Sequence, residues 1–295
     1  MTIDINEINT TVILVKTSLG KWHNTKQDAE LKEKIAKIIG ADVDRLSAGK
    51  KLAHSPVIKQ LSKLHGQFTN QIIRKMTVPW ATSVHMIRCD LVDQFEEKWQ
   101  AKKDVFDELL PELRAEYHNY IEQDRALLGD SFHAAEYPPI DDVIDCYYAD
   151  YEYDFLPVSN DIRVELPASK LTKMKADCEK RVTGKVENAM KVVHQRVVTT
   201  LEDLIAGLER HGLKPEGAQK AGNFSGNNIQ KVRELADILP SLNLTGDPAL
   251  TEAANDLIEK LDIGSAEELR KDDGKRMATA EKARTIVSKL AGFYD

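Results

Sequence analysis

A long apolar stripe between Leu171 and Leu208 constrains the fold of this chain more than any other feature. Its apolar residues recur every three or four positions, the spacing that lines one face of an α-helix. At 1.5 Å per residue such a helix would be about 60 Å long, more than the diameter of an ordinary small domain. We therefore expect a spine helix of about forty residues that serves as a stalk or an assembly seam. The stripe consists of Leu171, Met174, Cys178, Val182, Val186, Met190, Val193, Val197, Leu201, Leu204 and Leu208.

Composition favours a helical, cytoplasmic protein. The 295 residues are 42% apolar and 30% charged but only 6% aromatic, a balance that is more typical of helical domains than of β-sandwiches. The apolar run Val12–Val15 is too short for a membrane span or a signal-peptide core. Three unevenly spaced cysteines without a CxxC motif indicate reduced thiols, so we expect a cytosolic location and no membrane partner.

The pattern along the chain predicts a mainly α fold of long antiparallel helices with a small β-hairpin-like insert and a helical C-terminal tail. A short strand is expected at 11–15 and a first helix at 28–39. Ser55 and Pro56 begin a second helix that ends before Val78, and its short link to the next stripe favours an antiparallel pair. That third stripe covers 84–121, where Pro111 should kink or split the helix.

Three divisions of the chain are expected. Residues 1–213 would form a long-helix domain, with the β-containing insert at 130–166. The insert would include a hairpin between Tyr153–Val158 and Ile162–Leu166. A linker rich in Gly, Asn and Lys would cover 214–228, and 229–295 would form a small helical tail domain.

Charge is strongly segregated along the sequence. Residues 16–75 carry thirteen basic against five acidic residues, and residues 130–166 carry ten acidic against one basic. Residues 167–199 are basic again, with eight against three. Such blocks can pack against one another within the chain or between copies, or they can face a charged partner.

Motifs for catalysis and cofactor binding are absent from the sequence. The histidines show no zinc-site spacing, no phosphate-binding glycine loop follows a strand, and no nucleophile motif surrounds a serine or cysteine. The acids between Asp141 and Asp154 form a local run, which is more typical of a solvated or docking surface than of a two-metal site. We expect no catalytic residue, no cofactor, no metal site and therefore no enzyme.

The tyrosine-rich and acidic insert is the preferred contact surface. Tyrosines offer rigid amphipathic contact area, and the acids would select a basic partner or a basic helix of a second copy. The alternative is that these tyrosines simply cover the ends of the long helices. The candidate residues are Tyr137, Tyr147, Tyr148, Tyr151, Tyr153, Asp150 and Asp154.

Nucleic-acid binding is the alternative activity, because a basic helix can follow a phosphate backbone. The spine helix has a basic N-terminal half, and the second predicted helix and its approach are also basic. The candidates on the spine are Lys170, Lys173, Lys180, Arg181 and Lys185. The second group is Lys50, Lys51, Lys59, Lys63, Arg74 and Lys75.

Several landmarks resemble an uncharacterised helical family of phages and integrative elements of proteobacteria. They are Val12-Ile-Leu-Val15 with Ser18-Leu-Gly-Lys-Trp22, the Ser55-Pro56 helix start, Phe132-His-Ala-Ala-Glu-Tyr-Pro-Pro139 and Tyr153-Asp-Phe-Leu-Pro157. The resemblance covers about residues 10–210 and carries no catalytic motif. Genes of that family lie near MoxR-type AAA+ ATPases and von Willebrand factor A proteins. The resemblance implies a mobile-element context and an ATPase as a partner.

The expected function is therefore that of a non-enzymatic assembly or adaptor protein of a phage or mobile element. It would act through protein contacts and form homo-oligomers, because so long an amphipathic helix seldom buries its whole stripe within one domain. Its other partners would be an AAA+ ATPase or another phage or host protein. DNA or RNA binding through the basic helices is the alternative.

Overall fold

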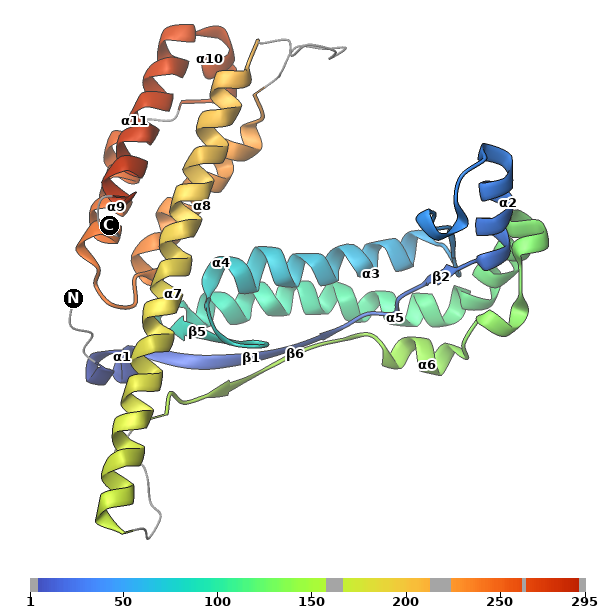
Figure 1. Ribbon diagram of the computed structural model, residues 1–295, viewed down its shortest axis with the longest axis horizontal. Helices are drawn as coiled ribbons and strands as arrows, with labels where there is room; N and C mark the ends of the chain where they lie inside the picture. Colours follow the sequence, from blue (N-terminus) through green and yellow to red (C-terminus); the bar gives the residue numbers. More distant parts are fainter. Residues whose placement is uncertain (1–4, 158–166, 213–223, 262–263, 292–295) are drawn as a thin grey trace. The chain divides into compact units, whose positions relative to one another are not determined.

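The protein is mainly α-helical, as the sequence predicts (Figure 1). The computed structural model describes residues 5–157, 167–212, 224–261 and 264–291. Its contacts divide the chain into two compact units. The first unit consists of Met1–Lys16, Arg74–Asp93 and Tyr153–Asp295, and the second consists of Thr17–Ile73 and Gln94–Glu152.

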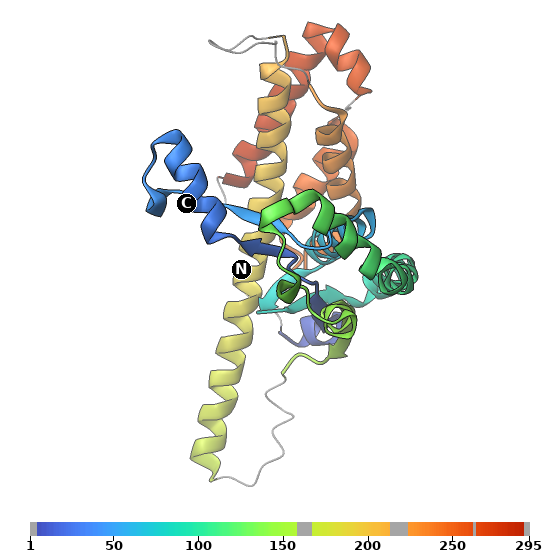
Figure 2. The ribbon, with the colours of Figure 1, turned by 90° about the vertical axis from the view of Figure 1, so that its right-hand side faces the viewer.

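The spine helix α7 (Ala168–Arg210) organises the first unit and confirms the predicted length, with 43 residues (Figures 1 and 2). Stripe positions from Cys178 to Leu208 are buried in the core of this unit. The helices that accompany α7 are α1 (Ile5–Thr11), α8 (Gly226–Leu242), α9 (Pro248–Asn255), η7 (Asp256–Lys260), α10 (Ala266–Lys271) and α11 (Asp273–Ala291). Of these, α8 and α11 pack along α7 itself.

The second unit has an aromatic core between two antiparallel helical segments. Helix α3 (Pro56–Gln67) continues into the π-helical turn η2 (Phe68–Ile73) and the short α4 (Arg74–Met76). Helix α5 (Val92–Leu128) runs back beside α3, as expected from the two stripes (Figure 1). The buried ring of Phe68 joins the two segments, with its centroid 4.7 Å from that of Trp99 and 6.2 Å from that of Phe106.

Two further segments complete the second unit. Strands β2 (Thr25–Gln27) and β3 (Gly49–Lys51) pair antiparallel, with α2 (Ala29–Ile39) and η1 (Val43–Arg45) between them in the chain. After α5 come the short helical turns η4 (Gly129–Ser131) and η5 (Ala134–Glu136) and then α6 (Ile140–Asp145).

The β structure is larger than the predicted hairpin-like insert. Four strands form one sheet in the order β4 (Val78–Ala81), β5 (Val84–Arg88), β1 (Val12–Gly20) and β6 (Tyr148–Asp154). Strand β5 is antiparallel to β4 and to β1, with Leu14 opposite Met86. The expected hairpin through Ser159 lies mostly outside the described residues, and only its first part, Tyr153–Pro157, is described.

The sequence did not predict the full sheet, because a short apolar run is compatible with either a strand or a helical turn. Val84, Ile87 and Leu91 have helical spacing, yet Val84–Arg88 is a strand and Cys89–Leu91 is the 3-10 turn η3. Ser83, with φ of 58°, provides the turn between β4 and β5. Its left-handed backbone is uncommon for a residue other than glycine and was not expected from the sequence.

Polar side chains cap several helix starts, including the predicted start at Ser55. Asp28 Oδ1 accepts from the N–H of Leu31 at 2.9 Å, and Ser55 Oγ accepts from the N–H of Ile58 at 3.3 Å. Ser265 and Glu268 form a capping box at the start of α10. These side chains satisfy N–H groups that the helices leave open at their first turns.

Pro111 does not split its helix into two, because α5 is continuous from Val92 to Leu128. The Pro111 ring is exposed, so it lies on the solvent side of the helix. There, water can bind the carbonyl oxygen that lacks an N–H partner.

The division into units differs from the expected domains. The tail helices α8 to α11 belong to the same unit as α7, and their buried side chains share one core with it. Phe224 is 1% exposed in this core, and α8 already begins at Gly226. The expected linker at 214–228 therefore includes structured residues at its end, while 213–223 lie outside the described residues.

Candidate interaction site

The five candidate tyrosines do not form one surface. Tyr147 is 5% exposed beside Phe106, and Tyr151 packs on Phe95 and Trp99 with centroids 5.4 and 5.2 Å away. Tyr137 is half-buried, and its hydroxyl donates to Asp124 at 2.8 Å. These three side chains therefore make contacts within the second unit.

Strand β6 presents the other candidates to solvent. Tyr148 is 44% exposed and Tyr153 is 36% exposed, and the carboxylates of Asp150 and Asp154 are also exposed. Because alternate residues of a strand share a face, Tyr148, Asp150 and Glu152 form one row. Ala149 and Tyr151 point to the opposite face, where Ala149 is buried. The exposed row is one part of the predicted insert that a partner can reach.

Gly20 fixes the position of Tyr148 at the start of this row. A Cβ atom at residue 20 would overlap the Tyr148 ring and lie 2.6 Å from the carbonyl oxygen of Cys146. Real Cβ atoms do not approach other atoms so closely. Glycine is therefore needed on β1 for the Tyr148 ring to lie against the strand.

Asp124 is the centre of a buried polar cluster in the second unit. Its Oδ2 accepts from the N–H of Ala53 at 2.5 Å and from the hydroxyl of Tyr137 at 2.8 Å. Ala53 has φ of 47°, a left-handed conformation that its side chain does not favour. Burial, together with the charge of Asp124, raises the pKa of Tyr117 to about 12. The cluster fixes the chain before α3 to the end of α5.

Lys50 forms a second buried cluster in the same unit. Its Nζ lies 2.8 Å from Glu136 Oε2 and 3.6 Å from Asp28 Oδ2, and it donates to the carbonyl oxygen of Ser131. The Leu31 N–H, and after it the Lys50 charge, hold the pKa of Asp28 below its ordinary value against the effect of burial. Lys50 was a candidate for nucleic-acid binding because of its charge alone. Since the residue is only 6% exposed, its ammonium group cannot contact a phosphate group.

The basic candidates on α7 fall into two groups. Arg181 contacts the Cys178 sulfur at 3.8 Å, and the Lys185 ammonium lies 4.4 Å from the centroid of Trp80, which is cation–π geometry. The side chains of Lys170, Lys173 and Lys180 are exposed and form no ion pair with any described residue. Arg181 is exposed as well, so it and the three lysines are open to a partner, whereas Lys185 is partly buried.

The N-terminal end of α7 also leaves apolar side chains uncovered. None of the residues from Ala168 to Asp177 is buried by the described residues. Leu171 is half-buried and Met174 is 44% exposed, although both continue the stripe that the core covers from Cys178 onward. Ten residues of helix correspond to about 15 Å. This basic amphipathic segment, Ala168–Asp177, together with the exposed Lys180 in the next turn, is called the α7 end below.

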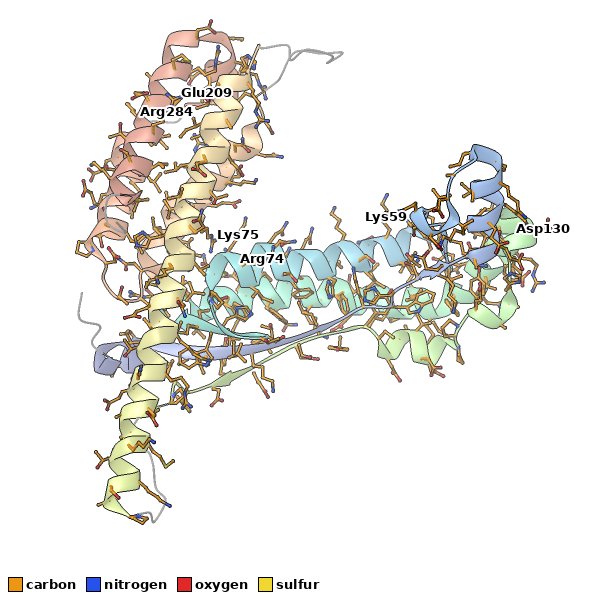
Figure 3. All side chains as sticks on the ribbon, in the orientation of Figure 1. Lys59, Arg74, Lys75, Asp130, Glu209 and Arg284 are labelled. Carbon is orange, nitrogen blue, oxygen red and sulfur yellow. The ribbon has the colours of Figure 1, made fainter. Side chains whose placement is uncertain are left out.

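The basic group around α3 is partly engaged within the chain: Lys50 and Lys75 form ion pairs, whereas Lys51, Lys59 and Lys63 are exposed. Lys75 forms an ion pair with Glu234 on α8. The Arg196 guanidinium donates to the carbonyl oxygens of Arg74 at 2.6 Å and Lys75 at 3.0 Å, and burial lowers the pKa of Arg196. Arg196 thereby satisfies carbonyl groups at the end of α4. Figure 3 shows Arg74 and Lys75 at this helix end, and Lys59 as an exposed side chain on α3.

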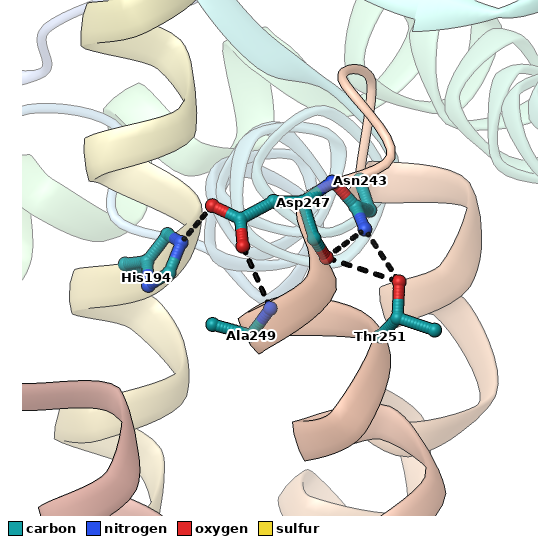
Figure 4. Close-up of polar contacts among 5 residues, drawn as sticks. All are labelled: His194, Asn243, Asp247, Ala249 and Thr251. Atoms are coloured by element: carbon teal, nitrogen blue, oxygen red, sulfur yellow. Dashed lines mark hydrogen bonds and ion pairs between the residues drawn. The ribbon is translucent and has the colours of Figure 1, made fainter. Parts of the chain in front are cut away.

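An acid–base pair lies in the core of the first unit (Figure 4). His194 Nε2 is 3.1 Å from Asp247 Oδ2, and His194 is 5% exposed. Asp247 Oδ1 accepts from the N–H of Ala249, and Asn243 binds both the backbone of Asp247 and the Thr251 hydroxyl. Asp247 thus caps α9 and connects it to α7. No sequence motif could have found this pair, because its two members are 53 residues apart.

The described residues carry neither a metal-binding cluster nor a membrane-spanning helix. They contain no group of three or more His, Cys, Asp or Glu side chains that could hold a metal ion. Within the same residues, every helix is too short or too polar to cross a bilayer.

Comparison with known proteins gives no family for this chain. No family model matches it, and neither the curated proteins nor the solved structures give a match. The resemblance to the mobile-element family therefore stays a prediction from the sequence.

Proposed function

We propose that this chain is a non-enzymatic assembly or adaptor protein that associates with further copies of itself. The observation that supports this function is the α7 end, where Leu171 and Met174 continue an apolar stripe that the described residues leave only partly covered. An amphipathic helix gains stability only when its apolar face is removed from water. A partner protein would cover that face.

The chemistry of the α7 end favours a protein over a nucleic acid. At the α7 end only Lys170, Lys173 and Lys180 could contact phosphates, because Lys185 further along the helix lies against the Trp80 ring. Tight duplex binding commonly uses about 6–10 phosphate contacts. A phosphate backbone would also leave Leu171 and Met174 in water, whereas a protein surface can bury them.

The proposal also includes a role in a phage or mobile element and an ATPase partner. If the resemblance of residues 10–210 is correct, the protein acts in a phage or mobile element, and an AAA+ ATPase is a further partner. Neither point depends on the α7 end. A pull-down with such an ATPase would test the context separately from self-association.

The proposed function is tested by light scattering coupled to gel filtration, at low and high salt, with and without a short DNA duplex. We expect a mass above the 33.2 kDa of one chain, decreasing as salt screens the lysines and unaffected by DNA. A protein that stays at the mass of one chain and shifts only with DNA at low salt would contradict self-assembly. That result would identify the lysines of α7 as a nucleic-acid site.

A further inference from the structure

The positive charge of the α7 end indicates what kind of surface it would bind. Lys170, Lys173 and Lys180 flank the exposed Met174, and these lysines lack carboxylate partners among the described residues. Such a segment fits a surface that combines carboxylates with an apolar or aromatic side chain. A neutral apolar groove would leave the lysines without counter-charges.

The exposed row on β6 has that combination. Tyr148, Asp150 and Glu152 point to the same face, and successive side chains in the row are about 6.6–6.8 Å apart. Tyr148 supplies aromatic area at one end, held in place by the absence of a side chain at Gly20. The carboxylate of Asp150 forms no ion pair or hydrogen bond with any described residue.

The two surfaces belong to one sequence and carry opposite charges. Lys170, Lys173, Lys180 and Asp150 are exposed and have no ionic partner among the described residues. Oppositely charged surfaces on one protein attract a second molecule of the same kind. The complementary occupant is thus a second copy of this chain.

We infer that the α7 end of one copy docks on the Tyr148–Asp150–Glu152 row of the next. The inference rests on the proposed function and specifies its contact. Because the two surfaces differ, the contact is heterologous, and each copy retains one free surface of each kind after binding. Association therefore proceeds head to tail and adds copies, rather than stopping at a symmetric dimer.

Two variants that each lose one surface test the head-to-tail contact. The helix variant carries Lys170→Gln, Lys173→Gln and Lys180→Gln, and the strand variant carries Asp150→Asn and Glu152→Gln. Each variant alone lacks one half of the contact and should stay at the 33.2 kDa of one chain. Mixed in equal amounts, they should form one species of twice that mass and nothing larger, since the intact helix of one binds the intact row of the other.

A matched control removes the same three charges elsewhere, through Lys34→Gln, Lys37→Gln and Lys59→Gln, which are all exposed. It should associate as the wild-type protein does, and circular dichroism should show that every variant is folded. If the wild-type protein associates but the mixture stays at the mass of one chain, the head-to-tail contact is wrong while self-assembly stands. If the wild-type protein itself stays at that mass, the proposed function fails.

Discussion

Lys50 and Asp124 show that single buried charges join distant parts of the second unit. Lys50 brings together Asp28, Ser131 and Glu136, and Asp124 holds the strained backbone of Ala53 and the hydroxyl of Tyr137. A buried donor that loses its acceptor costs about 1–3 kcal/mol. These contacts therefore have consequences that can be measured one residue at a time.

Asp124→Ala should lower the free energy of unfolding by about 2–3 kcal/mol, because it leaves the Ala53 N–H and the Tyr137 hydroxyl without their acceptor. Urea unfolding followed by circular dichroism measures the change. The exposed Asp130, labelled in Figure 3, provides the control, and Asp130→Ala should change stability by less than about 0.5 kcal/mol. Equal effects of the two substitutions would show that the Asp124 cluster does not stabilise the fold.

Asp28 should make stability depend on acid pH. Its pKa is lowered in the folded state, so its contribution is present above the ordinary value of 3.8 and is lost as pH falls through the lowered pKa. Asp28→Ala should therefore cost about 1–2 kcal/mol at neutral pH and progressively less below about pH 3.8. Urea unfolding of both proteins across this pH range measures the difference, and a difference that does not change with pH would contradict the assignment.

At the scale of single elements, the spine helix has two ends with different roles. From Cys178 to Leu208 its stripe is covered by its own unit, whereas Leu171 and Met174 are not fully covered. The same sequence pattern therefore stabilises the fold in one part and is available to a partner in the other. Substitutions along one stripe should separate the two effects.

Leu201→Ala should cost about 2–5 kcal/mol of stability, because Leu201 is fully buried and its loss leaves a cavity. The pair Leu171→Gln and Met174→Gln should change stability little and should instead weaken self-association. Thermal unfolding and light scattering measure the two effects. The exposed Ile38 and Ile39 of α2 give a matched control, since Ile38→Gln with Ile39→Gln should leave association unchanged. Loss of association in the control would contradict a specific role for the α7 end.

Local signals predicted the helices better than the sheet. The stripe from Leu171 and the helix start at Ser55 depend on neighbours within a few residues, and sequence spacing shows these directly. The pairing of Val12 with Arg88 depends on chain segments far apart, and no local pattern encodes it. Whether Pro111 splits its helix depends on which side of α5 faces water.

The candidate site could be predicted only in part for a similar reason. Composition located the tyrosines and acids of the insert and the lysines of α7. Burial then divided them, so that Tyr147 and Tyr151 belong to the core and Lys50 to an internal ion pair, while Tyr148 and Lys173 stay exposed. Which side of an element faces the core depends on tertiary packing, and side-chain type alone does not determine it.

At the scale of the whole molecule, the central claim is that copies of the chain associate through the α7 end. A heterologous contact has no fixed stoichiometry unless the copies close into a ring, so the average mass should increase with concentration. A symmetric contact would instead reach a plateau at two copies. The concentration dependence of mass therefore tests the claim without any substitution.

Sedimentation velocity over a broad concentration series is the most direct measurement. The account predicts a weight-average mass that starts near the 33.2 kDa of one chain and continues to increase beyond twice that value, with high salt reversing the increase. A mass that stays at 33.2 kDa at every concentration and salt would contradict self-association through the α7 end.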